Sequence, residues 1–138
     1  MIGIVIISHG NLAAGFYSSL ELFFGDEITQ LEYCCLAAED KPEDFSKELN
    51  NAIKKVDDGS GVIILADLFG GTPANRALYE ISDSVKVVTG VNLAMLLELI
   101  TLRISLESVA DINIHSLMKA AEENIRFLNE EIMLSMNE

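Results

Sequence analysis

Basic residues are scarce in this sequence. Nine lysines and arginines stand against 22 aspartates and glutamates in 138 residues, which gives a formal net charge of −13. Because nucleic-acid binders need a basic surface, this balance argues against nucleic acid, and against an anionic membrane surface, as a partner. An acidic surface favours solubility and would steer a basic protein toward it, although solvated helix faces account for the charge equally well.

Long apolar runs and basic leader segments are absent as well. The N-terminal apolar run extends only from Ile4 to Ile7, and no basic residue precedes it, so we expect no signal peptide. No segment is long and apolar enough to span a bilayer. A chain of this length, with 50% hydrophobic residues, is expected to form one cytoplasmic domain, residues 1–138, with a buried core.

Cysteine is limited to one adjacent pair, Cys34 and Cys35. Neighbouring side chains on a strand point to opposite faces, so this pair is badly placed for a disulfide or a metal chelate. We expect two reduced thiols without a function, one of them packed inward, which suits the cytosol.

Strand and helix signals alternate along the rest of the chain. Apolar, β-branched runs predict strands at residues 2–7, 28–36, 61–66 and 85–89, the second of them more typical of a sheet edge. Apolar residues at helical spacing, together with proline and glycine punctuation, predict helices at residues 11–24, 42–56, 73–82, 92–102 and 108–123. The residues expected to face inward are Leu12, Phe16, Leu20 and Phe23 in the first helix, Phe45, Leu49, Ile53 and Val56 in the second, and Ile114, Leu117, Met118 and Ala121 in the last.

This alternation predicts an α/β fold, with an open, mostly parallel sheet of about four strands and helices on both faces. The segment "IRFLN", from Ile125 to Asn129, fits either a continuation of the last helix or a short closing strand. Ligands of such sheets bind beyond the carboxyl ends of the strands. His9, Asp67 and the "GVN" segment at residues 90–92 are therefore expected along one rim.

His9 is one of only two histidines, and it stands at the end of the first strand in "GIVIISHGN". Gly10 follows it at the expected start of a helix, where free backbone N–H groups and the helix dipole favour an anion. A glycine at this place permits a positive φ or a close backbone approach. The sequence therefore places His9 beside an anion site.

The segment "DLFGGTPAN" supplies the second half of the predicted site. Asp67 ends a buried strand, where a carboxylate needs a partner, and a ring N–H of His9 is the natural one if the two strands are neighbours. Such a carboxylate fixes the tautomer and leaves the other ring nitrogen free as a nucleophile. Gly70, Gly71 and Thr72 supply converging N–H groups and a hydroxyl, which predict a second anion cradle.

A nucleophilic imidazole, an orienting carboxylate and anion donors together favour phosphoryl transfer onto histidine. The sequence has no Walker lysine motif, no GxGxxG, and no cluster of acidic ligands for magnesium. We therefore expect no metal and no cofactor, and a phosphoprotein as the donor in place of a nucleotide.

These residues resemble a known family. "GIVIISHGN", "DLFGGTPAN" and "VVTGVNLAML" are similar, in order and spacing, to segments of the IIA domain of the mannose/fructose/sorbose family of the bacterial phosphoenolpyruvate-dependent sugar phosphotransferase system. The resemblance covers essentially the whole chain. A related subunit that serves dihydroxyacetone kinase shares the histidine segment but lacks the "GGTPAN" pattern, which favours the transporter family.

The resemblance implies that His9 accepts a phosphoryl group from phospho-HPr and passes it to a IIB partner, which serves sugar uptake through membrane IIC and IID subunits. It implies that Asp67 orients the histidine and that Thr72 is the family's hydroxyl residue. It also implies a homodimer that exchanges a C-terminal strand, for which "IRFLN" is the candidate. Leu68 stands where some relatives carry a hydroxyl residue, and IIB is expected to be a separate polypeptide.

Other interpretations of the same residues are weaker or differ only in the acceptor. A regulatory phosphohistidine module, signalling to a transcription regulator or a kinase, would use the same chemistry. A hydrolase that pairs Ser8 with His9 is disfavoured because adjacent strand residues point to opposite faces and no GxSxG motif is present. A passive ligand-binding domain predicts no covalent phosphate. His115, near the start of the last helix, has no motif around it and is expected to be a solvated or half-packed side chain.

Overall fold

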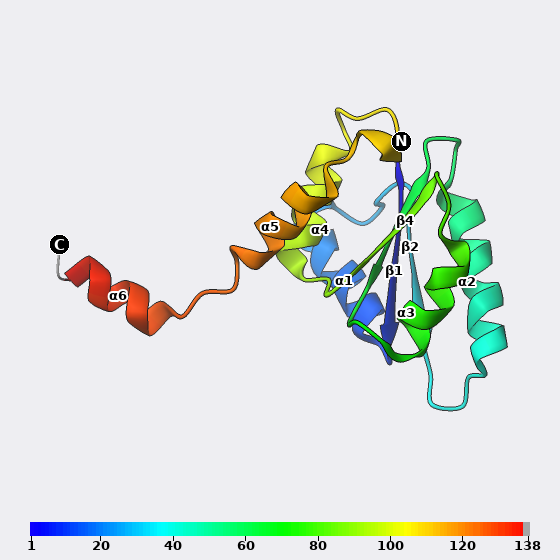
Figure 1. Cartoon of the computed structure of the whole chain (residues 1–138), viewed down its shortest axis with the longest axis horizontal. Helices are drawn as coiled ribbons and strands as arrows, with labels where there is room; N and C mark the ends of the chain where they lie inside the picture. Colours follow the sequence, from blue (N-terminus) through cyan, green and yellow to red (C-terminus); the bar gives the residue numbers. More distant parts are fainter. Residues whose placement is uncertain (137–138) are drawn as a thin grey trace.

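The computed structural model describes residues 1–136, in which strands alternate with helices as predicted (Figure 1). The strands are β1 (Gly3–His9), β2 (Leu31–Leu36), β3 (Val62–Ala66) and β4 (Val85–Thr89). The helices are α1 (Leu12–Phe24), α2 (Pro42–Val56), α3 (Gly71–Ala77), α4 (Leu93–Leu102), α5 (Ile114–Glu122) and α6 (Leu128–Met136). Two 3₁₀ turns, η1 (Leu78–Glu80) and η2 (Val109–Asp111), complete the described elements.

The strands form one open sheet in the order β2-β1-β3-β4, and every pairing is parallel. This confirms the predicted α/β class and the parallel sheet. Because β1 and β3 are neighbours, with Ile7 opposite Ala66, their carboxyl ends meet at the same rim of the sheet. The two strands that carry the candidate site are thus the two central strands.

Alternate side chains of β1 enter two separate apolar layers. Ile4 and Ile6 pack with residues of α1, α4 and α5, whereas Val5 and Ile7 pack with residues of α2 and α3. Figure 1 shows the same two groups of helices on opposite sides of the sheet. All four side chains are fully buried, which explains why β1 is an unbroken apolar run.

The helices bury the faces that the sequence predicted, except in parts of α1 and α5. The four inward residues predicted for α2 are all buried. In α1 the buried residues are Ala13 and Leu20, whereas Leu12 and Phe23 are exposed, because the face toward the sheet is rotated from the predicted one. In α5 Leu117 is buried, but Met118 lies at the surface.

Two elements differ in extent from the prediction. β2 begins at Leu31 because Gln30 has a left-handed backbone, with φ +51°, and its side-chain amide donates to the carbonyls of Met1 and Val56. α3 begins at Gly71, two residues before Pro73, and changes to the 3₁₀ turn η1 after Ala77.

The long C-terminal helix predicted over residues 108–123 is broken into η2 and α5. The Ser108 side chain caps η2 in a reciprocal arrangement with Asp111, and the Asn113 side chain caps α5 by accepting the Ser116 N–H. Each cap satisfies N–H groups that a continuous helix would bond internally, so two short elements replace one long one.

Neither alternative for residues 125–129 describes the structure. α5 ends at Glu122, residues 125–127 lie in an irregular connection, and α6 begins at Leu128. Figure 1 shows α6 standing away from the body of the molecule, and none of its residues is buried. Among residues 1–136, no helix combines the length and the apolar character that a membrane crossing requires.

Candidate functional site

The structure brings His9 and Asp67 into contact at the carboxyl rim of the sheet. One carboxylate oxygen of Asp67, Oδ2, accepts the His9 backbone N–H at 2.9 Å and lies 2.8 Å from His9 Nδ1. The other oxygen accepts the Leu68 N–H at 3.0 Å. The Asp67 side chain is 6% exposed and that of His9 is 45% exposed, so the site is a fixed carboxylate beneath an accessible ring.

The contact determines which ring nitrogen is free. Burial on its own would raise the pKa of the Asp67 carboxyl, but hydrogen bonds from the His9 backbone and ring and from the Leu68 N–H, together with the His9 charge, hold this pKa below its ordinary value. Asp67 is therefore ionised at neutral pH and can only accept hydrogen bonds, so His9 Nδ1 carries the proton. In the neutral ring Nε2 then bears the free lone pair.

The Gly71 backbone lies directly against the His9 ring. A Cβ atom at this position would be 2.7 Å from Cε1 and 2.9 Å from Nε2 of His9, distances that real side chains do not adopt. Gly71 also has φ +80°, in the left-handed region that disfavours other residues. Glycine is thus required here for both space and backbone conformation, and it leaves the approach to Nε2 open.

The turn after His9 is held by Ser8, which the sequence analysis considered only as a disfavoured hydrolase partner of His9. Its fully buried hydroxyl donates to the Gly10 carbonyl at 3.1 Å and accepts the Ala13 N–H at 2.7 Å. The Gly10 N–H in turn donates to the Leu36 carbonyl at 2.8 Å, with φ +57° at Gly10. Ser8 therefore satisfies an N–H group in the first turn of α1 and fixes the turn after His9; only its position two residues before Gly10 signalled this role.

Within residues 1–136, the remaining predicted site residues make no hydrogen bond to the His9 ring. Gly70 precedes α3, has φ +85°, and lines a groove next to the site. Thr72 is half-buried in the first turn of α3, and within residues 1–136 its hydroxyl has no hydrogen bond. His115 is exposed on α5, and the described part of the chain places no carboxylate against it.

The two thiols are distributed as predicted. Cys34 is buried and Cys35 half-buried, and both are free. Burial, with nearby Glu48 as a smaller cause, raises the pKa of Cys34 to about 12. This thiol is therefore protonated and unreactive at neutral pH.

Comparison with known proteins identifies the family. The sequence pattern of the EIIA-man family, described as "PTS system fructose IIA component", matches residues 3–126, which includes β1 and all of the rim described above. This chain belongs to the mannose/fructose/sorbose family of phosphotransferase-system EIIA components. The resemblance inferred from the three sequence motifs is thus confirmed.

Individual relatives of this EIIA component agree with the assignment. The chain is 30% identical over 105 residues to the fructose-specific EIIA component of Bacillus subtilis (strain 168), covering 75% of this chain and 71% of that protein. It is 30% identical over 104 residues to the mannose-specific EIIAB component of Escherichia coli (strain K12), covering 74% of this chain and 32% of that longer protein. The crystal structure of an EIIA component from Streptococcus agalactiae superposes with a TM-score of 0.83 at 31% identity, covering 94% and 99% of the two chains.

As a member of this family, the EIIA component is a phosphoryl carrier of a sugar-transport phosphotransferase system. Its carrier chemistry has to be explained by the residues at the rim. The only strongly positioned nucleophilic ring there, within residues 1–136, is that of His9.

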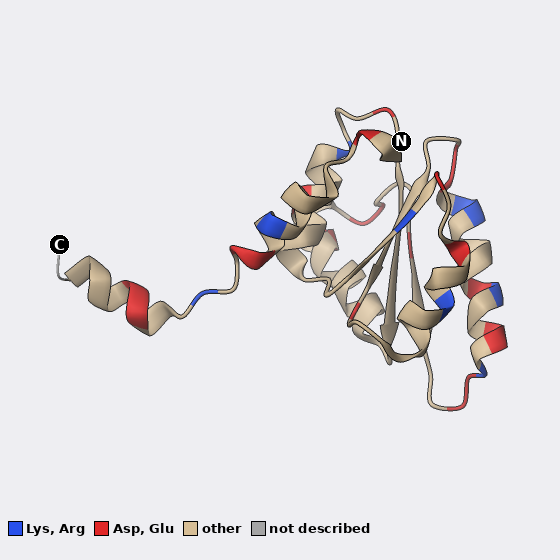
Figure 2. Cartoon of the chain, viewed as in Figure 1, with Lys and Arg blue, Asp and Glu red and all other residues tan. Residues whose placement is uncertain are grey.

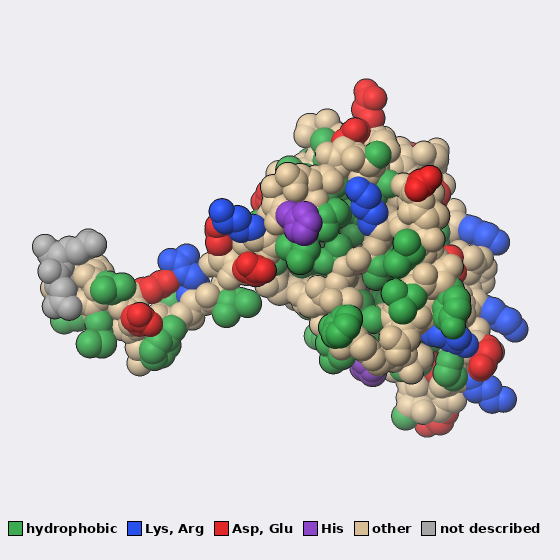
Figure 3. Space-filling view, viewed as in Figure 1, with side chains coloured by type: hydrophobic (Ala, Val, Ile, Leu, Met, Phe, Trp, Pro, Cys, Tyr) green, Lys and Arg blue, Asp and Glu red, His purple; other side chains and the backbone are tan. Residues whose placement is uncertain are grey.

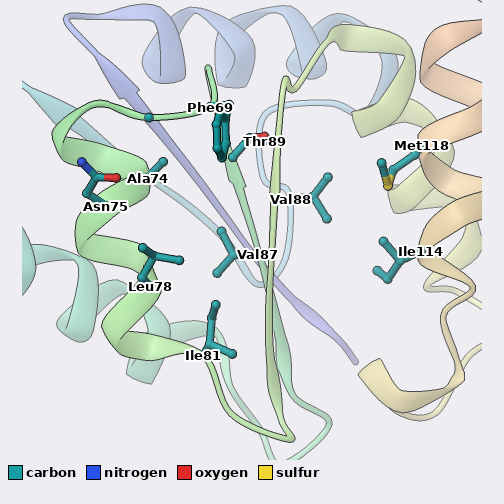
Figure 4. A pocket seen from close by; sticks show the side chains of 11 residues that line it. Phe69, Ala74, Asn75, Leu78, Ile81, Val87, Val88, Thr89, Ile114 and Met118 are labelled. Atoms are coloured by element: carbon teal, nitrogen blue, oxygen red, sulfur yellow. The ribbon is translucent and has the colours of Figure 1, made fainter.

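An apolar groove lies beside this rim, along the free edge of β4. It has a volume of about 350 Å³ and separates α3 and η1 from α5 (Figure 4). In the space-filling view, apolar side chains gather on this face (Figure 3). The groove is lined by Phe69, Gly70, Ala74, Asn75, Leu78, Ile81, Val87, Val88, Thr89, Ile114 and Met118.

Proposed function

We propose that His9 accepts a phosphoryl group from phospho-HPr and passes it to a separate IIB subunit, which serves sugar uptake through membrane IIC and IID subunits on the cytoplasmic side. The observation that carries this proposal is the contact between His9 Nδ1 and the buried Asp67 carboxylate. It leaves Nε2, which lies beside the Gly71 backbone, as the ring nitrogen that can act as the nucleophile.

The transfer needs no additional proton acceptor. The Nε2 lone pair attacks phosphorus as the bond from phosphorus to the donor's histidine nitrogen breaks, and the bonding electron pair returns to the donor ring. His9 keeps its Nδ1 proton and becomes a positively charged phosphoimidazolium. The Asp67 carboxylate stabilises this charge at 2.8 Å, and its hydrogen bond holds the ring plane during the in-line transfer.

The neighbouring backbone N–H groups are assigned the role of binding the phosphoryl oxygens. Gly10 shapes the turn before α1, with its own N–H bonded to the Leu36 carbonyl, whereas Gly70 and Gly71 stand at the start of α3, where N–H groups can turn toward an anion. Thr72 offers a hydroxyl that has no partner within residues 1–136. Gly71 has the additional task of keeping the space at Nε2 free.

The test is a reconstituted phosphorylation. The protein is incubated with phosphoenolpyruvate, enzyme I and HPr, and its intact mass is measured at neutral or alkaline pH, because phosphohistidine is labile in acid. The proposal expects a gain of one phosphoryl mass that requires HPr. No gain, with enzyme I and HPr shown to be active, would overturn it.

An Asp67→Asn variant is expected to fold but to accept the phosphoryl group about ten- to a hundredfold more slowly. The amide cannot stabilise the developing imidazolium charge, and a charge-assisted hydrogen bond is worth about 1.5–3 kcal/mol. Quenched-flow phosphorylation by phospho-HPr measures the change. An unchanged rate would remove Asp67 from the mechanism.

The same variant has a pH signature in stability. Because the folded-state pKa of Asp67 lies below its ordinary value of 3.8, the carboxylate stabilises the fold above that pH and loses this contribution as the pH falls further. The wild type should therefore be more stable than Asp67→Asn at neutral pH, and the difference in their free energies of unfolding should shrink in strong acid.

We also infer that the groove along β4 receives the C-terminal segment of a second copy, as the homodimers of this family imply. Within residues 1–136, β3 is the only strand paired with β4, and the other edge of β4 has only an isolated bridge between Ser82 and Val85, so the rest of that edge can accept a strand. Ile125 and Phe127, two residues apart in the connection before α6, are exposed apolar side chains, as expected of a segment that pairs with a partner's strand.

A double variant, Ile125→Asp and Phe127→Asp, is expected to be monomeric, because each lost apolar anchor costs roughly 2 kcal/mol of association. Light scattering coupled to size exclusion should show half the wild-type mass. Leu22→Asp, an exposed leucine on α1, is the matched control and should stay dimeric. A dimeric double variant, or a monomeric wild type, would contradict this interface.

A further inference from the structure

We propose that the outer edge of β2 binds an extended, basic segment of a partner protein, which adds to the sheet as a further strand. β2 stands at the end of the strand order β2-β1-β3-β4, opposite the β4 edge that the second copy is proposed to cover. Binding at the β2 edge uses none of the residues assigned to phosphoryl transfer, so it is a function in addition to that of His9.

The backbone of β2 has three residues whose polar groups are free for such pairing. The carbonyls of Gln30 and Leu36 accept N–H groups from the β1 side at 3.0 Å and 2.8 Å, so the even-numbered residues of this segment face β1. Because the pattern repeats every two residues, the N–H and C=O groups of Leu31, Tyr33 and Cys35 point away from β1. Within residues 1–136, no other backbone group bonds to them.

β2 lacks most of the features that protect a free sheet edge. Its sequence, LEYCCL, contains no proline and no lysine, and its register with β1 runs without a bulge. Its one charged residue, Glu32, is half-buried. Tyr33 is 42% exposed, with its ring centroid 5.4 Å from that of Tyr17. An added strand would pair the free backbone groups and cover the Tyr33 ring, which is the arrangement of β-strand addition.

Two adjoining hollows at this edge leave room for the added segment. The first has a volume of about 390 Å³ and is lined by the loop before β2, by Tyr17 and by Leu31. The second has a volume of about 260 Å³ and lies between β2 and α2. Glu32 and Lys55 line both hollows, which therefore form one continuous depression. Side chains of a segment paired with β2 can enter it, and such pockets give strand addition its specificity.

Charge decides which kind of segment fits this depression. One basic residue, Lys55, and four acidic residues line the two hollows: Asp26, Glu27, Glu32 and Glu48. Figure 2 shows acidic residues on the loop that leads into β2. Lysine or arginine side chains on the added segment would be attracted to this lining, whereas acidic side chains would be repelled.

A second copy of this chain is the less suitable occupant of the β2 edge. Each copy carries a formal net charge of −13, and two β2 edges brought together would set the same acidic residues against each other. The C-terminal segment is also acidic where α6 begins, at Glu130 and Glu131. The edge is therefore complementary to a basic segment of a different protein.

The test uses the full chain and short peptides in which lysine alternates with valine or threonine, with binding followed by fluorescence anisotropy. Saturable binding is expected. Methylation of one alternating set of peptide nitrogens should weaken it about tenfold or more, and methylation of the other set should have little effect, because only one set faces β2. In amide hydrogen exchange measured by NMR, the peptide should slow the N–H groups of Leu31, Tyr33 and Cys35.

A pair of charge variants tests the acidic lining. Glu32→Gln/Glu48→Gln is expected to weaken peptide binding about three- to tenfold, since exposed charge pairs each contribute modestly. Glu98→Gln/Glu107→Gln removes the same charge from α4 and the loop after it, where both side chains are exposed, and should leave the affinity unchanged.

Three results would overturn the proposal. They are absence of binding at peptide concentrations of about 1 mM, equal weakening by both methylation sets, and equal weakening in both charge variants. Slow exchange at the three N–H groups in the protein without peptide would mean that a second copy already covers the edge, which also contradicts it. None of these results bears on phosphorylation of His9.

Discussion

A His9→Gln variant takes up no phosphoryl group from phospho-HPr, whereas His115→Gln is phosphorylated at the wild-type rate. This result is expected because only His9 combines an exposed ring with a buried carboxylate on Nδ1. His115 is exposed on α5 and, within residues 1–136, has no such partner. Intact-mass spectrometry under non-acidic conditions gives the answer directly, as a gain of one phosphoryl mass or none.

The comparison of the two histidines is internally controlled. Glutamine at position 9 can still donate a hydrogen bond to Asp67, so thermal unfolding monitored by circular dichroism should show that the variant retains its fold. Loss of phosphorylation in His115→Gln, with His9→Gln unaffected, would mean that the wrong histidine has been assigned.

Gly71→Ala is expected to lower the phosphorylation rate by on the order of a hundredfold or more, since misplacement of a reacting group by about 1 Å has effects of that size. The added methyl carbon would lie 2.7 Å and 2.9 Å from two atoms of the His9 ring, so the ring must move. The methyl would also occupy space beside Nε2, which the phosphoryl group needs. Quenched-flow phosphorylation by phospho-HPr measures the loss of rate.

Gly90→Ala is the matched control for this variant. Gly90 has φ +78°, close to the +80° of Gly71, so both substitutions carry a similar backbone cost, of roughly 1–2 kcal/mol. Within the described residues 1–136, no atom comes within 4 Å of a Cβ added at Gly90. A rate loss confined to Gly71→Ala would identify contact with the ring as the cause, and equal losses in both variants would refute that explanation.

The central part of the site could be predicted because local signals and sheet geometry agree there. β1 and β3 are apolar on both faces, which marks them as buried parallel strands. The rule that such strands align their carboxyl ends then placed His9 and Asp67 at one rim, and the two strands are indeed neighbours. Two short runs and one topological rule therefore placed both residues at one rim, and the assumption that the two strands are neighbours is confirmed by the structure.

Features set by contacts between distant residues could not be predicted. Arg103 is buried and its guanidinium donates to the carbonyls of Ile2, Gln30 and Thr29, which ties the end of α4 to the start of the sheet. No local pattern signals these bonds, because their partners lie more than 70 residues away along the chain. The approach of Gly71 to the His9 ring is of the same kind.

The structure of the C-terminal segment was not predicted, because it too depends on contacts outside the segment. The apolar residues of 125–136 give a helix over Leu128–Met136 that buries nothing in this chain. Apolar spacing predicts that such residues need a cover, but it does not say which molecule provides it. In our proposal the cover is a second copy.

The central claim is that Asp67 holds Nδ1 and thereby directs the phosphoryl group to Nε2 of His9. The most direct test is heteronuclear NMR of the protein carrying ¹⁵N-labelled histidine, phosphorylated with phosphoenolpyruvate, enzyme I and HPr and kept at alkaline pH. We predict that phosphorus couples to the ¹⁵N resonance of Nε2 of His9, with Nδ1 still bearing its proton. Coupling to Nδ1, or a phosphoryl group on His115, would contradict the account.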